Sequence, residues 1–164
     1  MQTFNQDHAK KAAKTARASN FTDKALVPRY IAQNVPSTAS VLDYGCGKGV
    51  HVQALSFRGY KVTGHDFSSP NPKALKKQYD VVYLSNVLNT QSDLKMLAGT
   101  LDEAWGCVKK GGALIANFPL SPRYLGMDAQ ALKGCLEYFT RATVEVIKGM
   151  GTKQAPIFRI TRAK

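Results

Sequence analysis

The chain has 164 residues and a net charge of +12, with 23 lysines and arginines against 11 aspartates and glutamates. This length predicts one domain, and 44% hydrophobic residues suffice for a buried core, so a low-complexity chain is excluded. The positive surplus suggests a polyanionic partner, with DNA or RNA as the first choice, although a merely soluble basic protein would show it too.

The cysteines are odd in number and far apart, at Cys46, Cys107 and Cys135. They form no Cys-x-x-Cys or histidine pairing, so we expect neither a disulfide framework nor a metal site, and a cytoplasmic location fits. No apolar stretch is long enough to span a membrane, and the N-terminus lacks a signal-peptide core, so no membrane partner is expected. The sequence indicates no oligomeric state.

Residues 1–20 are polar and basic, and we predict that they form an N-terminal arm preceding a single domain over residues 21–164. Lys10, Lys14 and Arg17 would share one face of a helix. That helix is either solvated or orders on a cofactor or on nucleic acid.

A helix from Phe21 to Asn34 is predicted next, and a proline break separates it from a strand over Ser40 to Tyr44. Glycines at alternate positions then lead into a helix over Val50 to Phe57: Gly45, Gly47 and Gly49. Glycine lets backbone approach a ligand closely, and a helix N-terminus offers N–H groups to an anion. The spacing differs from the G-x-G-x-x-G of dinucleotide-binding folds, and the Gly-Lys-Ser/Thr ending of a phosphate-binding loop is missing.

A second predicted strand, Tyr60 to His65, ends at Asp66, about 20 positions after Gly45, where nucleotide-binding folds place an acid that holds ribose hydroxyls. Parallel strands share their carboxyl edge, so Asp66 is predicted beside the glycine turn. Phe67 is then the natural apolar wall against an adenine ring. The alternative is a turn-forming aspartate.

The segment Ser68 to Tyr79 is too short for a crossover helix and a further strand, because such a crossover takes about a dozen residues before its strand begins. We therefore predict a reduced sheet of six strands or fewer. The next buried strand is Asp80 to Ser85. A helix starting at Ser92 or Asp93 is predicted to carry Val108 and to end in the cation-then-glycine run Lys109 to Gly112.

The remaining predicted elements are a strand over Ala113 to Phe118, a helix from Asp128 to Phe139 and two β-rich runs. These runs, Thr143 to Lys148 and Ile157 to Thr161, would form a closing antiparallel pair.

Four landmarks in this order resemble class I S-adenosylmethionine (SAM) dependent methyltransferases: Asp43-x-Gly-x-Gly-x-Gly, Asp66, the Asp80-Val-Val strand and the strand after Gly112. The resemblance implies an α/β, Rossmann-like fold whose third strand is short or missing here, with a C-terminal antiparallel strand pair. The short segment after Asp66, the glycine motif, the phrase Asp-Val-Val-Tyr-Leu-Ser-Asn-Val-Leu-Asn and Ala104-Trp105 also resemble the methyltransferases found with bacterial DNA phosphorothioation genes.

The resemblance implies SAM as the cofactor, with Asp43 fixing its methionine end, Asp66 its ribose and Phe67 its adenine. The expected cofactor-binding residues are Asp43, Gly45, Cys46, Gly47, Gly49, Asp66, Phe67, Ser85 and Asn86. Transfer to a good nucleophile needs mainly alignment, so no dedicated base is required. The candidate catalytic residues are Asn86, Asn89 and Tyr124, whose alternative role is loop hydrogen bonding. His51 is expected to be a surface residue at a helix start.

Few motifs in the sequence indicate the methyl acceptor. Nucleic-acid amino-methyltransferases carry Asp/Asn/Ser-Pro-Pro-aromatic after the fourth strand, where this chain has no proline, and Asn117-Phe-Pro-Leu120 follows a different strand. We expect methyl transfer to nucleic acid or a nucleic-acid-associated acceptor. The alternatives are a small-molecule methyltransferase and a SAM-binding module without transferase activity. If the charge serves a polyanion, these cations should lie on the face of the SAM pocket: Lys10, Lys11, Lys14, Arg17, Lys76, Lys77 and Lys153.

Overall fold

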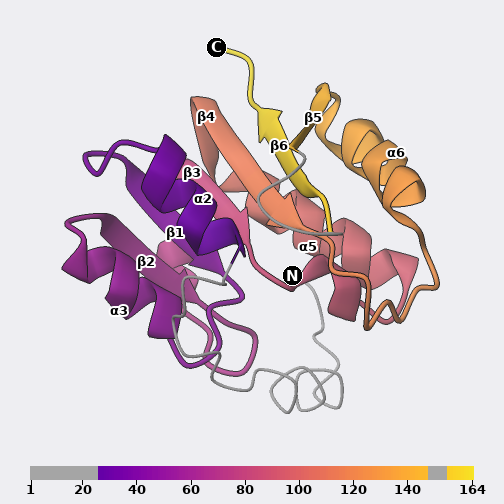
Figure 1. The fold of residues 1–164 in the computed structure, drawn as a ribbon, viewed down its shortest axis with the longest axis horizontal. Helices are drawn as coiled ribbons and strands as arrows, with labels where there is room; N and C mark the ends of the chain where they lie inside the picture. Colours follow the sequence, from indigo (N-terminus) through magenta and orange to yellow (C-terminus); the bar gives the residue numbers. More distant parts are fainter. Residues whose placement is uncertain (1–25, 148–154) are drawn as a thin grey trace.

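The computed structural model describes residues 26–147 and 155–164, which form a six-stranded sheet with helices on both faces (Figure 1). The strands are β1 (Ser40–Tyr44), β2 (Lys61–His65), β3 (Tyr79–Leu84), β4 (Val108–Asn117), β5 (Val144–Ile147) and β6 (Ile157–Thr161). The helices are α2 (Leu26–Asn34), α3 (Val50–Phe57), α4 (Pro72–Leu75), α5 (Leu94–Gly106) and α6 (Ala129–Thr140), with a short 3-10 turn η1 (Leu88–Thr90). The predicted N-terminal arm, the start of the helix predicted from Phe21 and Lys153 lie outside the described residues.

The strand order is β2-β1-β3-β4-β6-β5. Strands β1 to β4 are parallel, whereas β6 is antiparallel to β4 and β5 is antiparallel to β6. The C-terminal antiparallel pair is therefore confirmed. The chain moves outward from β1 to β2 and then returns to the other side of β1 as β3, so the order reverses there, and ligands of open α/β sheets bind at the carboxyl ends of strands at such a reversal.

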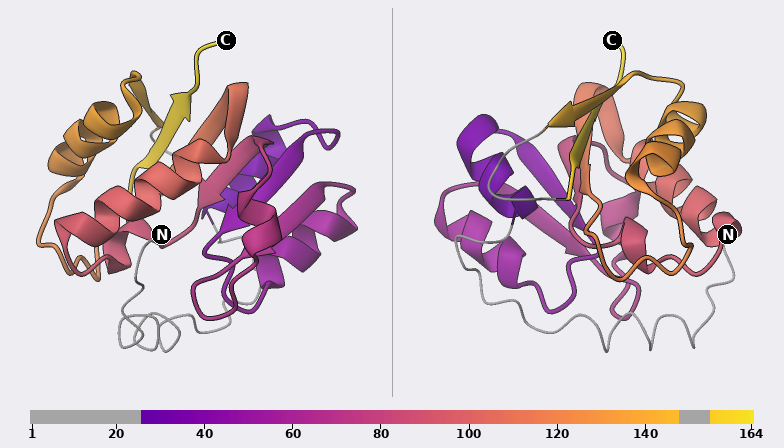
Figure 2. Two further views of the ribbon diagram at one scale, coloured as in Figure 1. Left: turned by 180° about the vertical axis from the view of Figure 1, so that it is seen from behind. Right: turned by 45° about the vertical axis from the view of Figure 1, so that its right-hand side comes forward.

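Side chains alternate along each strand and build a separate core on each face of the sheet. Leu42, Val82 and Leu114 point to the face covered by α5 and α6. Val41 and Tyr83 point to the opposite face, which α2 and α3 cover. Figure 2 shows α5 and α6 in the view from behind, away from the two earlier helices. Asp43 shares the face of Val41 and so lies on the side of α2 and α3.

The segment between β2 and β3 holds only the four-residue helix α4 and no strand, so the prediction of a reduced, six-stranded sheet is confirmed for the described residues. Asn71 caps α4, because its side-chain oxygen accepts a hydrogen bond from the Ala74 N–H at 3.2 Å. Its side-chain amide also donates to the Gly64 carbonyl oxygen at 3.2 Å. Ala74 of α4 belongs to the core on the face covered by α5 and α6, so this short helix packs on that face of the sheet.

The predicted boundary between α5 and β4 is wrong. Helix α5 ends at Gly106, and Val108 is a buried strand residue paired with Tyr79. Gly112 is not a helix cap: a Cβ added there would lie 2.8 Å from the Asp80 carbonyl oxygen, so glycine permits close approach of β3. A cation-then-glycine run is typical of a helix end and also of a strand that lies close to its neighbour. Here the pairing of β4 with β3 makes the run part of a strand.

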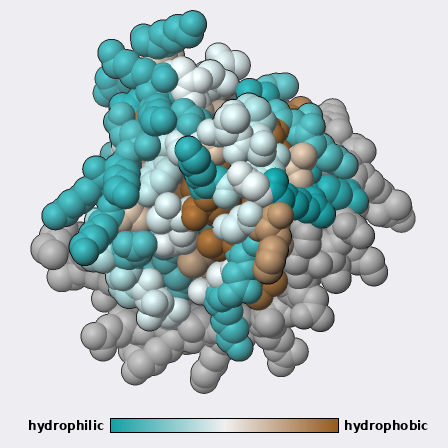
Figure 3. All heavy atoms as spheres, turned by 90° about the vertical axis from the view of Figure 1, so that its left-hand side faces the viewer, coloured by the Kyte–Doolittle hydropathy of each residue, from teal (hydrophilic) through white to brown (hydrophobic). Residues whose placement is uncertain are grey.

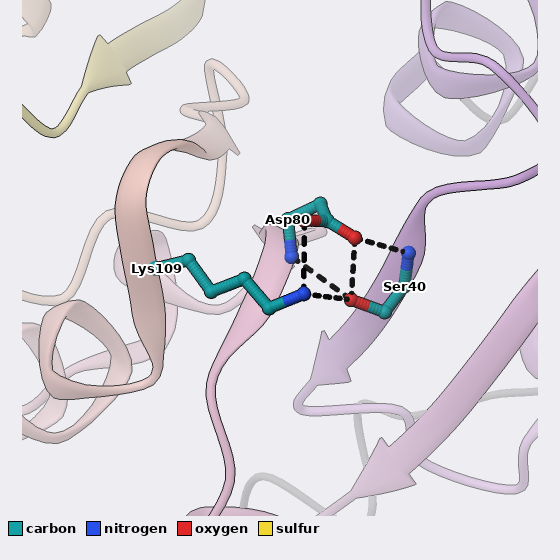
Figure 4. A network of polar contacts seen from close by, with 3 residues as sticks. All are labelled: Ser40, Asp80 and Lys109. Carbon is teal, nitrogen blue, oxygen red and sulfur yellow. Dashed lines mark hydrogen bonds and ion pairs between the residues drawn. The ribbon is translucent and has the colours of Figure 1, made fainter. Parts of the chain in front are cut away.

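The amino ends of β1, β3 and β4 are joined by a network around Asp80 (Figure 4). One carboxylate oxygen accepts hydrogen bonds from the Ser40 backbone N–H and the Ser40 hydroxyl, both at 2.7 Å. The other lies 3.0 Å from the Lys109 ammonium. The hydrogen bonds from Ser40, followed by Lys109, lower the pKa of Asp80 to about 2.

We expect Asp80→Asn to reduce the free energy of unfolding by about 1 kcal/mol at pH 6, a value discounted because both charged side chains are partly exposed. The folded pKa lies below the unfolded value, so this stabilisation is present above about pH 4 and is lost as the pH falls toward 2. Urea denaturation at pH 6 and pH 2.5 measures it. The control is Asp102→Asn, at an exposed position of α5. An Asp80→Asn effect of equal size at both pH values would contradict the account.

Candidate functional site

The glycine turn follows β1 at the carboxyl edge of the sheet. Gly45, Gly47 and Gly49 have φ values of 91°, 52° and 76°, a region that favours glycine. The N–H groups of Gly45 and Cys46 donate to the His65 carbonyl oxygen at 2.7 and 3.0 Å, which fastens the turn to the end of β2. A Cβ added at Gly45 would lie 2.4 Å from Val87 Cγ2, so the turn also packs against the segment after β3.

Asp66 lies beside this turn, as its position after β2 predicted. Its Oδ2 atom accepts a hydrogen bond from the Gly47 N–H at 2.8 Å. Its Oδ1 atom accepts from the Ser68 N–H at 2.9 Å and from the Ser68 hydroxyl at 2.5 Å. An ionised carboxylate has about four acceptor positions, so capacity remains for a ligand hydroxyl. The turn-forming role and the binding role are therefore compatible.

Phe67 is half-buried next to Asp66. Its ring meets the Tyr44 ring edge-on, with centroids 5.5 Å apart, and the His65 ring at 6.0 Å. The Asn71 backbone N–H donates to His65 Nδ1 at 3.1 Å, and burial lowers the pKa of His65. The histidine is therefore neutral at pH 7, and this aromatic group holds Phe67 beside the ribose-binding candidate.

Asp43 is the most unusual ionisable group at this edge. It is 1% exposed, and its Oδ2 atom has no hydrogen-bond partner among the described residues. Burial raises the pKa of Asp43 to about 7, and the neighbouring Tyr83 hydroxyl only partly offsets that rise. The buried Tyr83 hydroxyl is the side-chain group that faces this carboxylate. One neutral hydroxyl only partly compensates the burial of a carboxylate, so Asp43 is suited to a cationic ligand group or its bound water.

The far side of the site is a pair of asparagines at the ends of β3 and β4. The Asn86 backbone N–H donates to Asn117 Oδ1, and Asn117 Nδ2 donates to Asn86 Oδ1, both at 2.7 Å. This pairing holds Asn86 at φ 59°, the left-handed conformation that asparagine tolerates better than most residues. Asn86 itself stays exposed.

Comparison with known proteins shows the family to which the chain belongs. A methyltransferase domain family matches residues 6–147, most of the chain. The chain belongs to this methyltransferase family. No sequence among the curated proteins matches the chain significantly.

Solved structures of methyltransferases have the same fold. A TehB-like SAM-dependent methyltransferase from Corynebacterium glutamicum is 18% identical, with a TM-score of 0.66, over 98% of this chain and 100% of the other. The 1,6-didemethyltoxoflavin N1-methyltransferase of Burkholderia thailandensis, solved with S-adenosylhomocysteine, is 13% identical, with a TM-score of 0.64, over 100% and 93%. A SAM-bound amino pentose methyltransferase from Micromonospora echinaspora is 13% identical, with a TM-score of 0.62, over 99% of both chains. The predicted class I methyltransferase fold is thereby confirmed.

The other residues predicted for the site differ from one another in burial and surroundings. Cys46 is half-buried in the turn, and burial raises the pKa of its thiol to about 12, so the thiol is unreactive at pH 7. Ser85 is half-buried at the end of β3. His51 lies in the first turn of α3, as expected, but it is half-buried rather than on the surface, and burial lowers its pKa. Asn89 is buried, and its Oδ1 atom has no partner among the described residues.

Tyr124 and Asn89 come from different loops, and the structure joins them. The Tyr124 backbone N–H donates to the Asn89 carbonyl oxygen at 3.3 Å. Sequence reasoning missed Asn117, because its Asn-Phe-Pro setting was compared only with a nucleic-acid motif. A polar residue ending a buried strand at the ligand edge is the signal that identifies it.

Among the described residues no helix is long and apolar enough to cross a membrane, and no group of histidines, cysteines and carboxylates is arranged to hold a metal ion.

Proposed function

We propose that this protein transfers the methyl group of SAM to a small-molecule acceptor. The observation that carries the SAM site is the buried Asp43 carboxylate, two residues before a glycine turn that Asp66 contacts directly. Asp66 accepts from the ribose hydroxyls, Phe67 borders the adenine, and the turn leaves backbone room for the methionine end. Asp43 balances the positive charge of that end.

When bound, SAM supplies an electrophilic methyl group, and the protein's part is alignment and exclusion of water. Asn86 and its partner Asn117 hold together the carboxyl ends of β3 and β4. Asn89 offers a buried amide oxygen, able to accept a hydrogen bond from an acceptor amine or hydroxyl. Its backbone contact with Tyr124 keeps the β4–α6 loop over the same side.

The small-molecule acceptor is supported by the surface of the carboxyl edge. Large apolar side chains are exposed on the segments that follow the strands there: Leu94, Leu120 and Tyr124. Charged residues on these segments nearly balance, with Lys48, Lys73, Lys95 and Arg123 against Asp66, Asp93 and Asp128. Apolar surface with few polar groups is typical of small-molecule sites. The sugar- and toxoflavin-precursor-methylating neighbours fit this class.

A nucleic-acid acceptor was the sequence-based expectation, and it remains a second candidate. Lys76 and Lys77, two of its seven predicted cations, immediately precede β3 and so lie at the amino edge, away from the glycine turn. The other five fall outside the described residues. Support for this candidate therefore rests on the basic arm and on the total charge.

The test is incubation of the protein with methyl-labelled SAM and separated cell fractions: low-molecular-weight extract, DNA, RNA and protein. We expect label in the low-molecular-weight extract, and a loss of that label with Asp66→Ala. Label in DNA or RNA instead would establish the second candidate. A protein that binds SAM and labels no fraction would be a binding module.

A further inference from the structure

Four exposed lysines of the described residues lie at the amino edge of the sheet, opposite the glycine turn. Lys61 starts β2, Lys76 and Lys77 precede β3, and Lys110 lies near the start of β4. All four are exposed, and none forms an ion pair with another described residue.

Pairing between strands makes these positions one continuous row. Ser40 at the start of β1 is the register partner of Lys61, and its hydroxyl contacts Asp80 of β3. Asp80 in turn contacts Lys109 of β4. The Gly111 N–H donates to the Arg162 carbonyl oxygen at 2.9 Å, which adds the end of β6 to the row. Adjacent strands lie about 4.8 Å apart, so the four neighbouring strands from β2 to β4, which the four lysines span, give a row roughly 15 Å long.

Carboxylates do not neutralise this row. Asp80 is already shared between Ser40 and Lys109, and the two ion pairs of the described residues, Lys109–Asp80 and Lys133–Glu137, include none of the four lysines. Figure 3, which views the molecule from the β2 side, shows hydrophilic side chains along its upper and left-hand parts, the upper part being where β6 ends in Figure 1.

An aromatic side chain is exposed to solvent at one end of the row. Phe57, the last residue of α3, is 93% exposed and is followed by Arg58. Exposed aromatics among cations are the composition of surfaces that bind single-stranded nucleic acid, in which bases stack on rings while lysines contact phosphates.

We propose that the amino edge, defined as Phe57, Lys61, Lys76, Lys77 and Lys110, is a docking surface for single-stranded nucleic acid. The row is linear, which matches a single strand better than a planar lipid surface. Strands of five to six residues separate the two edges by about 15–20 Å. A nucleic-acid strand bound at the amino edge therefore leaves the glycine turn open. The surface would tether the protein to nucleic acid without bringing a methyl acceptor to the SAM site. This inference rests on the charge distribution and is independent of the proposed methyl transfer.

The test measures binding of a fluorescent 20-nucleotide single strand to the full chain over a salt series. The variant replaces Lys61, Lys76, Lys77 and Lys110 with glutamine, and the control replaces Lys48 and Lys95 at the carboxyl edge. We expect the variant to lose at least tenfold in affinity and its log–log salt slope to fall by about 3, since each single-strand phosphate contact contributes about 0.7. Phe57→Ala should weaken binding about fivefold.

SAM affinity, measured by calorimetry on the same proteins, should not change with the amino-edge variant, which also shows that it is folded. Equal affinity and slope in the wild type and the amino-edge variant would overturn the proposal, as would equal losses in the control. Tighter binding of a duplex, or binding to phosphatidylserine vesicles without binding to the strand, would also overturn it.

Discussion

Gly45→Ala is expected to lower the free energy of unfolding by about 2–5 kcal/mol. Two costs act together at this residue. Its φ of 91° is strained for alanine, which contributes about 1–2 kcal/mol. The added Cβ would also meet Val87 Cγ2 at 2.4 Å, and overpacking of this kind costs about 1–3 kcal/mol. Urea denaturation of the variant measures the sum.

Gly49 supplies the matched control. Its φ is 76°, but a Cβ there meets nothing within 4 Å, so Gly49→Ala should cost about 1–2 kcal/mol from backbone strain alone. Combining Gly45→Ala with Val87→Ala should recover part of the loss, because the clashing methyl group is removed. Equal losses in the free energy of unfolding for Gly45→Ala and Gly49→Ala would show that the contact with Val87 does not contribute to the cost.

Asp43→Asn is expected to stabilise the cofactor-free protein at pH 8 by about 1–3 kcal/mol while weakening SAM binding at least tenfold. The folded pKa of Asp43, about 7, lies above its unfolded value of 3.8. Its favourable contribution is therefore complete below about pH 4 and is lost as the pH rises through 7. The asparagine variant does not titrate, so its advantage should appear between pH 5 and pH 8.

Urea denaturation at pH 5 and pH 8, with calorimetry of SAM binding between pH 6 and pH 8, tests this. Wild-type affinity for SAM should rise with pH as Asp43 ionises, whereas the affinity of Asp43→Asn should stay flat. Asp128→Asn, at an exposed helix cap, is the control for general charge effects. A variant less stable than the wild type at pH 8, with unchanged SAM affinity, would contradict this role of Asp43.

The sequence predicted the elements whose signals are local. The strand Ser40–Tyr44, the helix Val50–Phe57 and the helix capped by Asp128 appear as expected, because glycine spacing, apolar runs and capping residues act within a few positions. The missing strand was predictable for a different reason: the segment after Asp66 lacks the length for it.

Features that depend on strand pairing were not predictable. Val108 was assigned to a helix because its partner Tyr79 is distant in sequence. The Asn86–Asn117 pair likewise needs β3 and β4 to be neighbours before the two amides can meet. The same holds for the amino-edge lysines, whose common location follows from parallel pairing. The location of Lys76 and Lys77 was predicted wrongly, because the prediction considered that the 68–79 segment leaves from the carboxyl edge but not that it returns to the amino edge before β3.

The central claim is that SAM binds at the glycine turn beside Asp66, and calorimetry of SAM with Asp66→Ala tests it most directly. The comparison protein is Ser68→Ala, which loses only the hydroxyl that donates to the same carboxylate. We predict that Asp66→Ala weakens binding by about 1.5–3 kcal/mol, the scale of hydrogen bonds to a charged group, while Ser68→Ala changes it little. Unchanged affinity in a folded Asp66→Ala protein would contradict this assignment of the site.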